Sequence, residues 1–484
     1  MTLRGEAVIF ALTVIIIKAT MIRLHYLSIS LALWGCSFFD LQAQDAAKSV
    51  STAVERLMSD PSMRYAQLGV HVEEAGSGKV LYSHDGRVGL VPASSQKVVT
   101  AATALELLGK DHRFETIFAH AGAPKDGVVD GPLVVIGDGD PTLGSDRFMA
   151  TQEQAVVTGL TAALDKAGIR QFRGGIEGRI GAVERATIPS GWIWEDIGNY
   201  YGAGHAALNW HENRFTLWLR PGRQPGDPVM VDRTDPSMDG IRFHNELVSG
   251  AAGSGDNAYL FIRPGSSDMV IRGSVPCCVG QFKISGAVMD PVAFTLRRLQ
   301  LIGRASGVVR ESSEKGINGL TIIHTHRSPG LDSIVREFLR ESINLFGEAL
   351  VHAVSATGTA TSTYDDGLAR MRRLWQERGI DPEALRMEDG SGLSPRNRVT
   401  AESLVKVLQD ARKRPWFNVF EQALPVHDGI RMKSGSMTGV RSYAGYIRGT
   451  DGTMRVFSVI VNNYSGSGSA MARRLRELIA WMSR

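Results

Sequence analysis

The chain contains few cysteines, few aromatic residues and no run of one charge. Only three of its 484 residues are cysteines, and a bridge between the adjacent Cys277 and Cys278 would be strained, so no disulfide framework is expected. No Cys-x-x-Cys or histidine cluster indicates a metal site, and no cofactor is expected. Lys and Arg are scattered and the net charge is only +4, which argues against a nucleic-acid partner.

Length and glycine content point to a chain of several domains. A chain of 484 residues is too long for one compact core, so two or three domains are expected. The apolar fraction of 43% and the charged fraction of 21% are ordinary for a globular protein. The 53 glycines predict many turns and strands.

Residues 1–44 have the parts of a secretory signal. A second start at Met21 is followed by basic residues, by an apolar stretch over 27–39 and by the small residue Ala43. This order is typical of a cleaved export signal, and the apolar part is short for a membrane span. Export to the periplasm is therefore expected. Three alternatives stay open: a start at Met1, a lipid anchor on Cys36, and a retained segment that associates with the membrane.

Hydrophobic periodicity predicts strands near both ends of the chain and helices between them. A hairpin is expected over 67–82 and strands over 133–136, 442–448 and 454–462. Helices are expected over 94–108, 151–167, 291–305, 331–354, 364–378, 402–414 and 470–482. If the first hairpin pairs with the last strands, one antiparallel sheet joins both ends of the chain.

The middle of the chain is then an insertion into this α/β (α+β) body. The predicted division has a catalytic body over 45–115 and 325–484, an inserted domain over 116–204 and 286–324, and a nested insert over 205–285.

Ser94 and Lys97 form the first motif that carries chemistry. On a helix, residues three apart lie on one face, so Lys97 can reach the Ser94 hydroxyl. A serine needs a base beside it, and a desolvated lysine can be neutral enough to serve. The chain contains two other Ser-x-x-Lys matches, which are interpreted as pairs on the surface. The Ser94 pair differs from them because a hairpin and Pro92 precede it and an apolar helix follows it.

A polar loop and a strand edge supply two further motifs. The loop Asp-Gly-Ser-Gly-Leu-Ser over 389–394 is followed by Asn397; a hydroxyl and an amide there can relay a proton and hold a substrate amide. The second piece runs from Lys433 to Ser436, just before a predicted strand. Lys433, Ser434 and Ser436 can bind a carboxylate, and Gly435 allows close approach of a substrate backbone.

Each motif alone is unspecific, but the three in this order form the active site of penicillin-binding proteins and serine β-lactamases. The chain resembles the class C low-molecular-mass penicillin-binding proteins, which are D-alanyl-D-alanine carboxypeptidases/endopeptidases. The likeness extends over most of the chain after residue 65 and includes Val-Pro-Ala-Ser-Ser-Gln-Lys (91–97), Gly-Asp-Gly-Asp-Pro-Thr-Leu (137–143), His-Arg-Ser-Pro (326–329) and Lys-Ser-Gly-Ser (433–436). It implies a transpeptidase-like domain, an antiparallel sheet flanked by helices, with large mixed α/β insertions.

The resemblance also implies roles in peptide hydrolysis. Ser94 would attack the D-Ala carbonyl with Lys97 as its base, and water would then hydrolyse the acyl-enzyme. Ser394 and Asn397 would assist proton transfer and substrate placement. The expected partners are peptidoglycan stem peptides and β-lactam antibiotics.

The remaining implied roles concern substrate binding. Lys433, Ser434 and Ser436 would hold the terminal carboxylate, and the backbone N–H groups of Ser94 and Ser436 would form the oxyanion hole. Asp196 would receive the free amine of a diaminopimelate side chain, with Tyr201 packed beside it; a surface Asp and a core Tyr is an equally good interpretation of that pair.

One departure from the family pattern leaves the assignment of the loop open. A strict Ser-x-Asn motif would need Asn at position 396, where this chain has Arg396, and Asn397 comes one residue later. Two alternative functions also stay open. One is a β-lactamase or esterase of the same fold, and the other is a non-catalytic scaffold that binds the cell wall.

Overall fold

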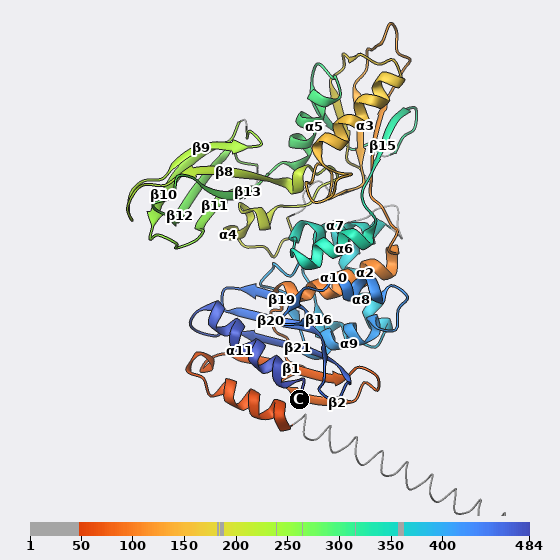
Figure 1. Ribbon diagram of the computed structural model, residues 1–484. Coiled ribbons are helices and arrows are strands. Elements are labelled where there is room, and N and C mark those ends of the chain that lie inside the picture. Colours follow the sequence, from red (N-terminus) through yellow and green to blue (C-terminus); the bar gives the residue numbers. More distant parts are fainter. Residues whose placement is uncertain are drawn as a thin grey trace, which may run out of the picture.

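The computed structural model describes residues 48–181, 183, 188–238, 240–263, 265–314, 316–356 and 363–484. The predicted signal segment, with Met21, Cys36 and Ala43, lies outside the described residues. Figure 1 shows a body that contains both the first and the last strands, with two groups of elements from the middle of the chain above it. Among the described helices, none combines the length and the apolar character that a membrane crossing requires.

The body is built on a six-stranded antiparallel sheet. Its strand order is β18-β19-β20-β21-β1-β2, with β1 (Gln67–Glu74), β2 (Val80–His84), β18 (Val426–His427), β19 (Ile430–Met437), β20 (Val440–Arg448) and β21 (Met454–Asn462). The register places Val70 of β1 opposite Val459 of β21. The expected pairing of the first hairpin with the last strands is therefore confirmed.

Helices cover both faces of this sheet. On one face, a helix over 48–58 and α11 (Gly468–Trp481) bury Val54 and Leu475 against the sheet residues Val70 and Phe457. On the other face lie α2 (Lys97–Leu108) and α9 (Ala401–Ala411). Because both faces are covered, β21 is buried along almost its whole length, which explains its nearly continuous apolar sequence.

The predicted helix over 331–354 is wrong, because two helices occupy this stretch. They are α6 (Leu331–Arg340) and α7 (Asn344–Ala356). Ser342 between them has a φ of +59°, a left-handed conformation that an α-helix of L-residues does not continue through. The apolar pattern runs across the break because Phe338 and Phe346, one from each helix, enter the same core.

The helix predicted from residue 94 also begins differently. Residues Ala93–Gln96 form a 3₁₀ turn, and α2 starts only at Lys97. Ala93 has a φ of +47°, an uncommon conformation for a residue with a side chain. The remaining helices of the body are α8 (Tyr364–Glu377) and α10 (Phe417–Ala423), and a two-stranded ribbon pairs β16 (Leu385–Arg386) with β17 (Arg398–Val399).

The middle of the chain builds its own sheets. A five-stranded sheet has the order β14-β7-β5-β3-β15, with β3 (Glu115–His120), β5 (Leu133–Gly137), β7 (Ile176–Arg179), β14 (Val309–Ser312) and β15 (Thr321–Arg327). The helices α3 (Glu153–Lys166) and α5 (Pro291–Ile302) lie beside it (Figure 1). β3 and β15 pair antiparallel, so the chain leaves the body and returns to it side by side.

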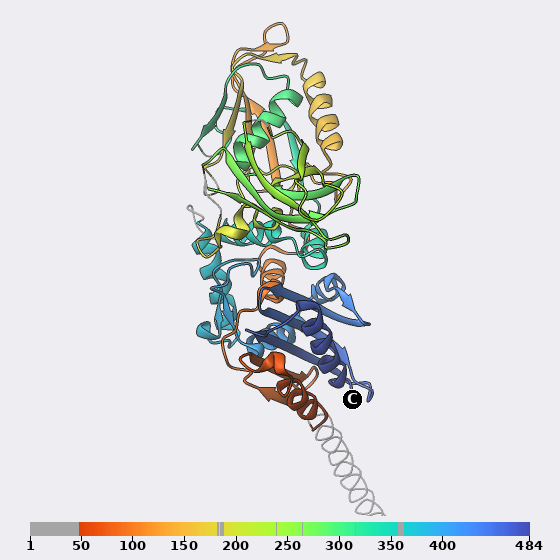
Figure 2. The same ribbon diagram turned by 90° about the vertical axis from the view of Figure 1, so that its left-hand side faces the viewer.

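The residues between β7 and α5 form two three-stranded sheets. One has the order β13-β8-β9 and the other β10-β12-β11, with β8 (Arg214–Arg220), β9 (Met230–Asp235), β10 (Arg242–Gly250), β11 (Asn257–Ile262), β12 (Asp268–Pro276) and β13 (Phe282–Ala287). Figure 2 shows these strands above the body, together with the five-stranded sheet and its helices α3 and α5. The short pair β4 (Val128–Val129) and β6 (Gln171–Phe172) completes the described strands. The division into three domains with the predicted boundaries stays a prediction.

Candidate active site

Lys97 is the centre of a buried polar cluster. Its Nζ atom lies 3.0 Å from Ser94 Oγ, 2.6 Å from Asn344 Oδ1 and 2.7 Å from the Ser391 carbonyl oxygen. The lysine is fully buried. Burial, together with the nearby positive charge of Lys433, lowers the pKa of Lys97 well below its usual value, against the opposing effect of nearby carboxylates. A neutral amine 3.0 Å from Ser94 Oγ can accept the hydroxyl proton.

The turn that carries Ser94 is held from two sides. Ser442 of β20 and Ser95 both donate hydrogen bonds to the Pro92 carbonyl oxygen. A Cβ atom on Gly435 would lie 2.5 Å from that oxygen and 2.9 Å from the Ser94 nitrogen. Gly435 is therefore required so that strand β19 can lie against the Ser94 turn, a reason different from the expected approach of substrate.

Ser342 and Asn344 were missed by the sequence interpretation. Ser342 lies in the break between α6 and α7, and Asn344 is the first residue of α7. Lys433 Nζ lies 3.0 Å from Ser342 Oγ. Asn344 accepts from Lys97 through Oδ1 and donates through Nδ2 to the Tyr201 carbonyl oxygen at 2.8 Å. The signal was present, since residues 342–344 read Ser-Ile-Asn with the strict Ser-x-Asn spacing. The pattern was hidden by the expectation of one continuous helix.

Ser394 and Asn397 lie on the loop that contacts Lys97, but their side chains bond to other residues. Ser394 Oγ donates to the Gly191 carbonyl oxygen at 3.0 Å. Asn397 donates to Asp389 Oδ1 at 2.9 Å and accepts from the backbone of Glu388. In the part of the chain that the structure describes, neither side chain hydrogen bonds to Ser94 or Lys97.

The buried Asp389 carboxylate organises this loop. It accepts hydrogen bonds from the backbone of Gly392 and Ser394 and from the Trp192 indole, whose Nε1 lies 2.9 Å from Oδ2. The loop so held presents the Ser391 carbonyl oxygen to Lys97.

Lys433 lies inside a strand rather than before one. It belongs to β19 and is paired in register with Ala444 of β20. Burial lowers the pKa of Lys433 to about 8, so its ammonium carries a charge at neutral pH. Ser434 is half-buried and Ser436 is exposed, which leaves hydroxyls available beside this charge.

Asp196 and Tyr201 lie on a segment that touches the polar cluster around Lys97. Asp196 is in α4 (Trp194–Ile197) and Tyr201 is in a 3₁₀ turn, Tyr200–Gly202. Both are half-buried, and their side chains hydrogen bond to each other. Burial raises the pKa of Asp196 to about 6. Because Asn344 holds the Tyr201 carbonyl, this segment is tied to Lys97 through one side chain.

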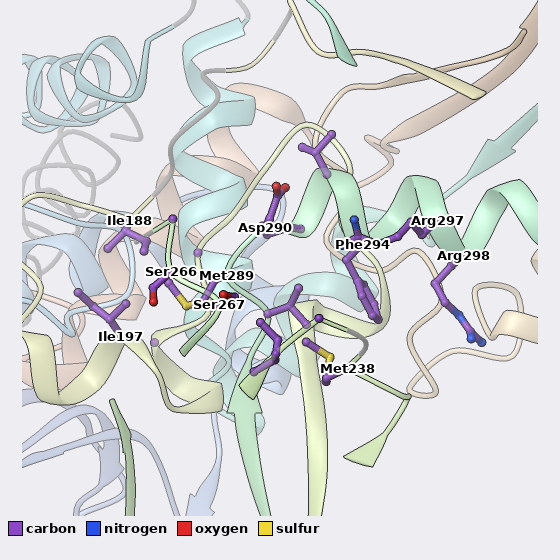
Figure 3. Close-up of a pocket in the computed structure, with 18 of the residues that line it drawn as sticks. Ile188, Ile197, Met238, Ser266, Ser267, Met289, Asp290, Phe294, Arg297 and Arg298 are labelled. Carbon is purple, nitrogen blue, oxygen red and sulfur yellow. The ribbon is translucent and has the colours of Figure 1, made fainter. Parts of the chain in front are cut away.

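A pocket of about 1180 Å³ lies outside the Ser94 cluster. Figure 3 shows that Met238, Met289 and Phe294 line it, with Arg297 on the adjoining helix α5. Ser94, Lys97 and Lys433 are not among its lining residues. It shares Trp192, Ile197 and Gly202 with the segment around Asp196, so it adjoins that segment and is separate from the Ser94 cluster.

Comparison with known proteins identifies the family. The model of the D-Ala-D-Ala carboxypeptidase 3 (S13) family matches residues 50–483. The chain belongs to the S13 family. A D-alanyl-D-alanine carboxypeptidase of Actinomadura sp. (strain R39) is 30% identical over 465 residues, which cover 88% of this chain and 84% of the relative. The DacB D-alanyl-D-alanine carboxypeptidase of Haemophilus influenzae is 23% identical, with 83% and 86% covered.

A solved structure supports the same fold for this S13 chain. The crystal structure of penicillin binding protein 4 from Haemophilus influenzae superposes with a TM-score of 0.75 at 21% identity, over 90% of this chain and 99% of that one. The expected fold class and the resemblance to class C penicillin-binding proteins are thus confirmed. As a member of the S13 family, the protein is a serine-type D-Ala-D-Ala carboxypeptidase, a peptidase of peptidoglycan.

Proposed function

We propose that Ser94 is the nucleophile of this carboxypeptidase and that neutral Lys97 is its general base. Lys97 takes the proton from Ser94 Oγ as this oxygen attacks the carbonyl carbon of the penultimate D-Ala. The bond to the terminal D-Ala then breaks, and the proton passes to the leaving nitrogen. Water hydrolyses the acyl-enzyme with the same base. The three contacts of Lys97 Nζ, with Ser94, Asn344 and the Ser391 carbonyl, are the observation on which this assignment depends.

Ser342 and Asn344 take the roles expected of Ser394 and Asn397. Ser342 bonds to Lys433 and Asn344 bonds to Lys97, so this one short segment links the two lysines. Its hydroxyl can relay the proton toward the leaving group, and its amide fixes the orientation of the base. Ser394 and Asn397 instead hold the Asp389 loop in place.

Lys433 binds the terminal carboxylate of the substrate, with the Ser434 and Ser436 hydroxyls beside it. An ammonium in a buried position interacts strongly with a carboxylate. The backbone N–H groups of Ser94 and Ser436 serve as the oxyanion hole, which the close packing of β19 against the Ser94 turn supports.

Asp196 and Tyr201 recognise the free amine of a diaminopimelate side chain. Asp196 is half-buried, and its ionised form can pair with an ammonium group. Recognition of this amine suits both terminal D-Ala release and cleavage of D-Ala-diaminopimelate cross-links, so we propose that the enzyme performs both reactions.

A covalent penicillin label tests the nucleophile. The intact protein is incubated with a fluorescent penicillin, and the labelled peptide is identified by mass spectrometry. We expect a label on Ser94 and none in the Ser94→Ala variant, with circular dichroism showing that the variant is folded. A folded wild-type protein without any label would remove the proposal.

Product analysis separates the alternative functions. Fast turnover of penicillin without D-Ala release from muropeptides would identify a β-lactamase or esterase. Binding of the wild type to cell walls without D-Ala release, unchanged in Ser94→Ala, would identify a scaffold. The Haemophilus influenzae protein has also been crystallised with a β-lactam, and we propose that this chain binds β-lactams too.

The enzyme acts in the periplasm after removal of the predicted signal. Residues 1–44 carry the sequence pattern on which this depends. Fractionation of cells that express the full chain, with sequencing of the mature N-terminus, tests it. A mature protein that starts near residue 44 is expected, and an uncleaved or lipidated chain in the membrane fraction would contradict it.

A further inference from the structure

We propose that Glu348, together with the Tyr364 hydroxyl, is a positioning group that holds the 389–391 loop against Lys97 and tunes this base. The inference rests on the proposed role of Lys97. Glu348 lies on α7 four residues after Asn344, so both side chains lie on the same face of the helix. Asn344 bonds directly to Lys97, whereas Glu348 acts through the loop.

The contacts of Glu348 are with the loop backbone. Its Oε2 atom accepts a hydrogen bond from the Gly390 nitrogen at 3.0 Å and another from the Tyr364 hydroxyl. The Tyr364 oxygen lies 3.1 Å from the same Gly390 nitrogen. The carboxyl group is fully buried, and removing this acceptor would leave the Gly390 N–H with only the longer contact to the Tyr364 oxygen, at a cost in stability.

The loop is held on its other side by α2 and by the 3₁₀ turn that precedes it. Thr100 Oγ1 donates to the Gly390 carbonyl oxygen at 2.6 Å, and Gln96 Nε2 donates to the Asp389 carbonyl oxygen at 2.6 Å. Gly390 also packs on α7 so closely that a Cβ atom would lie 2.4 Å from the Gly347 carbonyl oxygen. The Ser391 carbonyl, 2.7 Å from Lys97 Nζ, is therefore positioned between two helices, with Glu348 as the anchor on α7.

Glu348 also acts on Lys97 through its charge. Burial, together with the negative charge of Asp389, raises the pKa of Glu348 to about 7. Its ionised form raises the pKa of Lys97. The titratable groups around Glu348 are Asp389, Lys97, Tyr364, His352 and His205. Burial lowers the pKa of His352 to about 2 and of His205 to about 4, so both imidazoles are neutral near pH 7.

Glu348→Gln separates this role from a purely structural one. The second-order rate of acylation by benzylpenicillin is measured from pH 5 to pH 9 in the wild type and in this variant. The neutral amide is a weaker acceptor than the carboxylate for the Gly390 N–H, so the loosened loop should lower the maximal rate by about tenfold. Loss of the negative charge lowers the pKa of Lys97, so the acid limb of the profile moves to lower pH.

Two further variants control the experiment. Tyr364→Phe removes a hydrogen bond that favours ionised Glu348, so its acid limb should move in the same direction by less. Glu177→Gln removes another buried carboxylate, in β7 of the inserted sheet, and should leave the profile unchanged. Thermal unfolding of each variant identifies loss of the fold.

The outcomes are distinct. A folded Glu348→Gln variant with the wild-type maximal rate and the wild-type acid limb would overturn the inference and leave the proposed function intact. Failure of the wild-type protein to be acylated would overturn the proposed function itself. If Glu348→Gln does not fold, the inference is tested by the pH profile of acylation in Tyr364→Phe. An acid limb at the same pH as in the wild type would then contradict the inference.

An independent observation supports a second proposal: we infer that Cys277 and Cys278 form a reversible disulfide with each other. Their sulfur atoms lie 2.8 Å apart in the turn between β12 and β13. The backbone of this turn is held, since Cys277 donates to the Gly250 carbonyl and Cys278 to the Gly222 carbonyl. Cys278 is exposed and Cys277 is buried, so an oxidant reaches one sulfur first.

A small-molecule disulfide such as oxidised glutathione can drive the reaction. The Cys278 thiolate attacks it, forms a mixed disulfide and releases one glutathione. The Cys277 thiolate then attacks the Cys278 sulfur and releases the second glutathione. Two thiol protons are lost, two protein sulfurs are oxidised and one glutathione disulfide is reduced to two thiols. Neighbouring Cα atoms lie about 3.8 Å apart, closer than disulfides prefer, so the bridge should be easily reduced.

Peptide mass mapping after treatment with oxidised glutathione tests this proposal. In the wild type, the tryptic peptide 273–283 should be lighter by two hydrogen atoms and carry no glutathione, and a thiol reductant should reverse the change. Cys277→Ser should carry a stable glutathione adduct on Cys278, and Cys278→Ser should carry none. A wild-type peptide that keeps the adduct, or stays reduced, would overturn the proposal.

Discussion

Lys433 Nζ and Ser342 Oγ lie 3.0 Å apart, although the lysine belongs to a strand of the sheet and the serine to the break between two helices. Two residues further on, Asn344 bonds to Lys97. One short segment therefore touches both buried lysines, and the positive charge of one lowers the pKa of the other. This segment therefore links the sheet to the helices at the point where Lys97 and Lys433 meet.

Asn344→Ala and Asn397→Ala form a matched pair that distinguishes a residue that acts on the base from one that stabilises the loop. Asn344 contacts Lys97, so its loss should lower the rate of acylation by about 10²–10³-fold. Asn397 bonds to the buried Asp389, so its loss should cost about 1–3 kcal/mol of stability and affect the rate less. Stopped-flow acylation and chemical denaturation measure the two effects. Equal rate losses in two folded variants would contradict the assignment.

The pH dependence of peptide hydrolysis should report the charge of Lys433. Burial lowers its folded-state pKa to about 8, so the ammonium that we propose binds the carboxylate is present below pH 8 and lost as the pH rises through that value. We expect kcat/KM for D-Ala release to fall above pH 8 by about tenfold for each pH unit. A substrate with an amidated C-terminus should lack this limb. The same limb with both substrates would exclude Lys433 as its cause.

Gly435→Ala should damage the site by moving the Ser94 turn. The added methyl group would meet the Pro92 carbonyl oxygen at 2.5 Å and the Ser94 nitrogen at 2.9 Å, and such overpacking costs about 1–3 kcal/mol. We expect a lower melting temperature and slower penicillin acylation. Gly429→Ala is the control, because a Cβ atom there meets nothing within 4 Å, although its positive φ adds some strain. A fully active, equally stable Gly435→Ala variant would contradict the prediction.

Asp196→Asn should reduce discrimination between substrates. The pKa of Asp196 is raised to about 6, so its negative charge is present above pH 6 and disappears as the pH falls through it. Wild-type preference for a peptide with a free diaminopimelate amine over its N-acetylated form should therefore grow from pH 5 to pH 7. The variant should show little preference at either pH. Competition kinetics with the two peptides measure this, and a preference that the variant retains would exclude Asp196.

Much of the local structure followed from periodicity. The first hairpin, its pairing with the last strands and the helices near 153–166 and 401–411 agree with the sequence pattern. The break at Ser342 was not predicted, because both helices turn apolar residues toward one core and their patterns join. The 3₁₀ turn at Ser94 was also missed, since its conformation comes from contacts with Ser442 and Gly435 that lie more than 300 residues away in the chain.

Spacing along the chain was enough to predict the local chemistry, which comprises a serine with a lysine three residues on and a Lys-Ser-Gly motif. These depend on neighbours in the chain, where covalent spacing sets the distances. Which hydroxyl and amide contact the two lysines could be seen only in the folded structure, because those contacts depend on how helices, sheet and loop pack. Burial of Lys97 requires polar partners for its amine, and the folded chain supplies them from Asn344 and the Ser391 carbonyl. Ser394 and Asn397 instead contact Gly191 and Asp389.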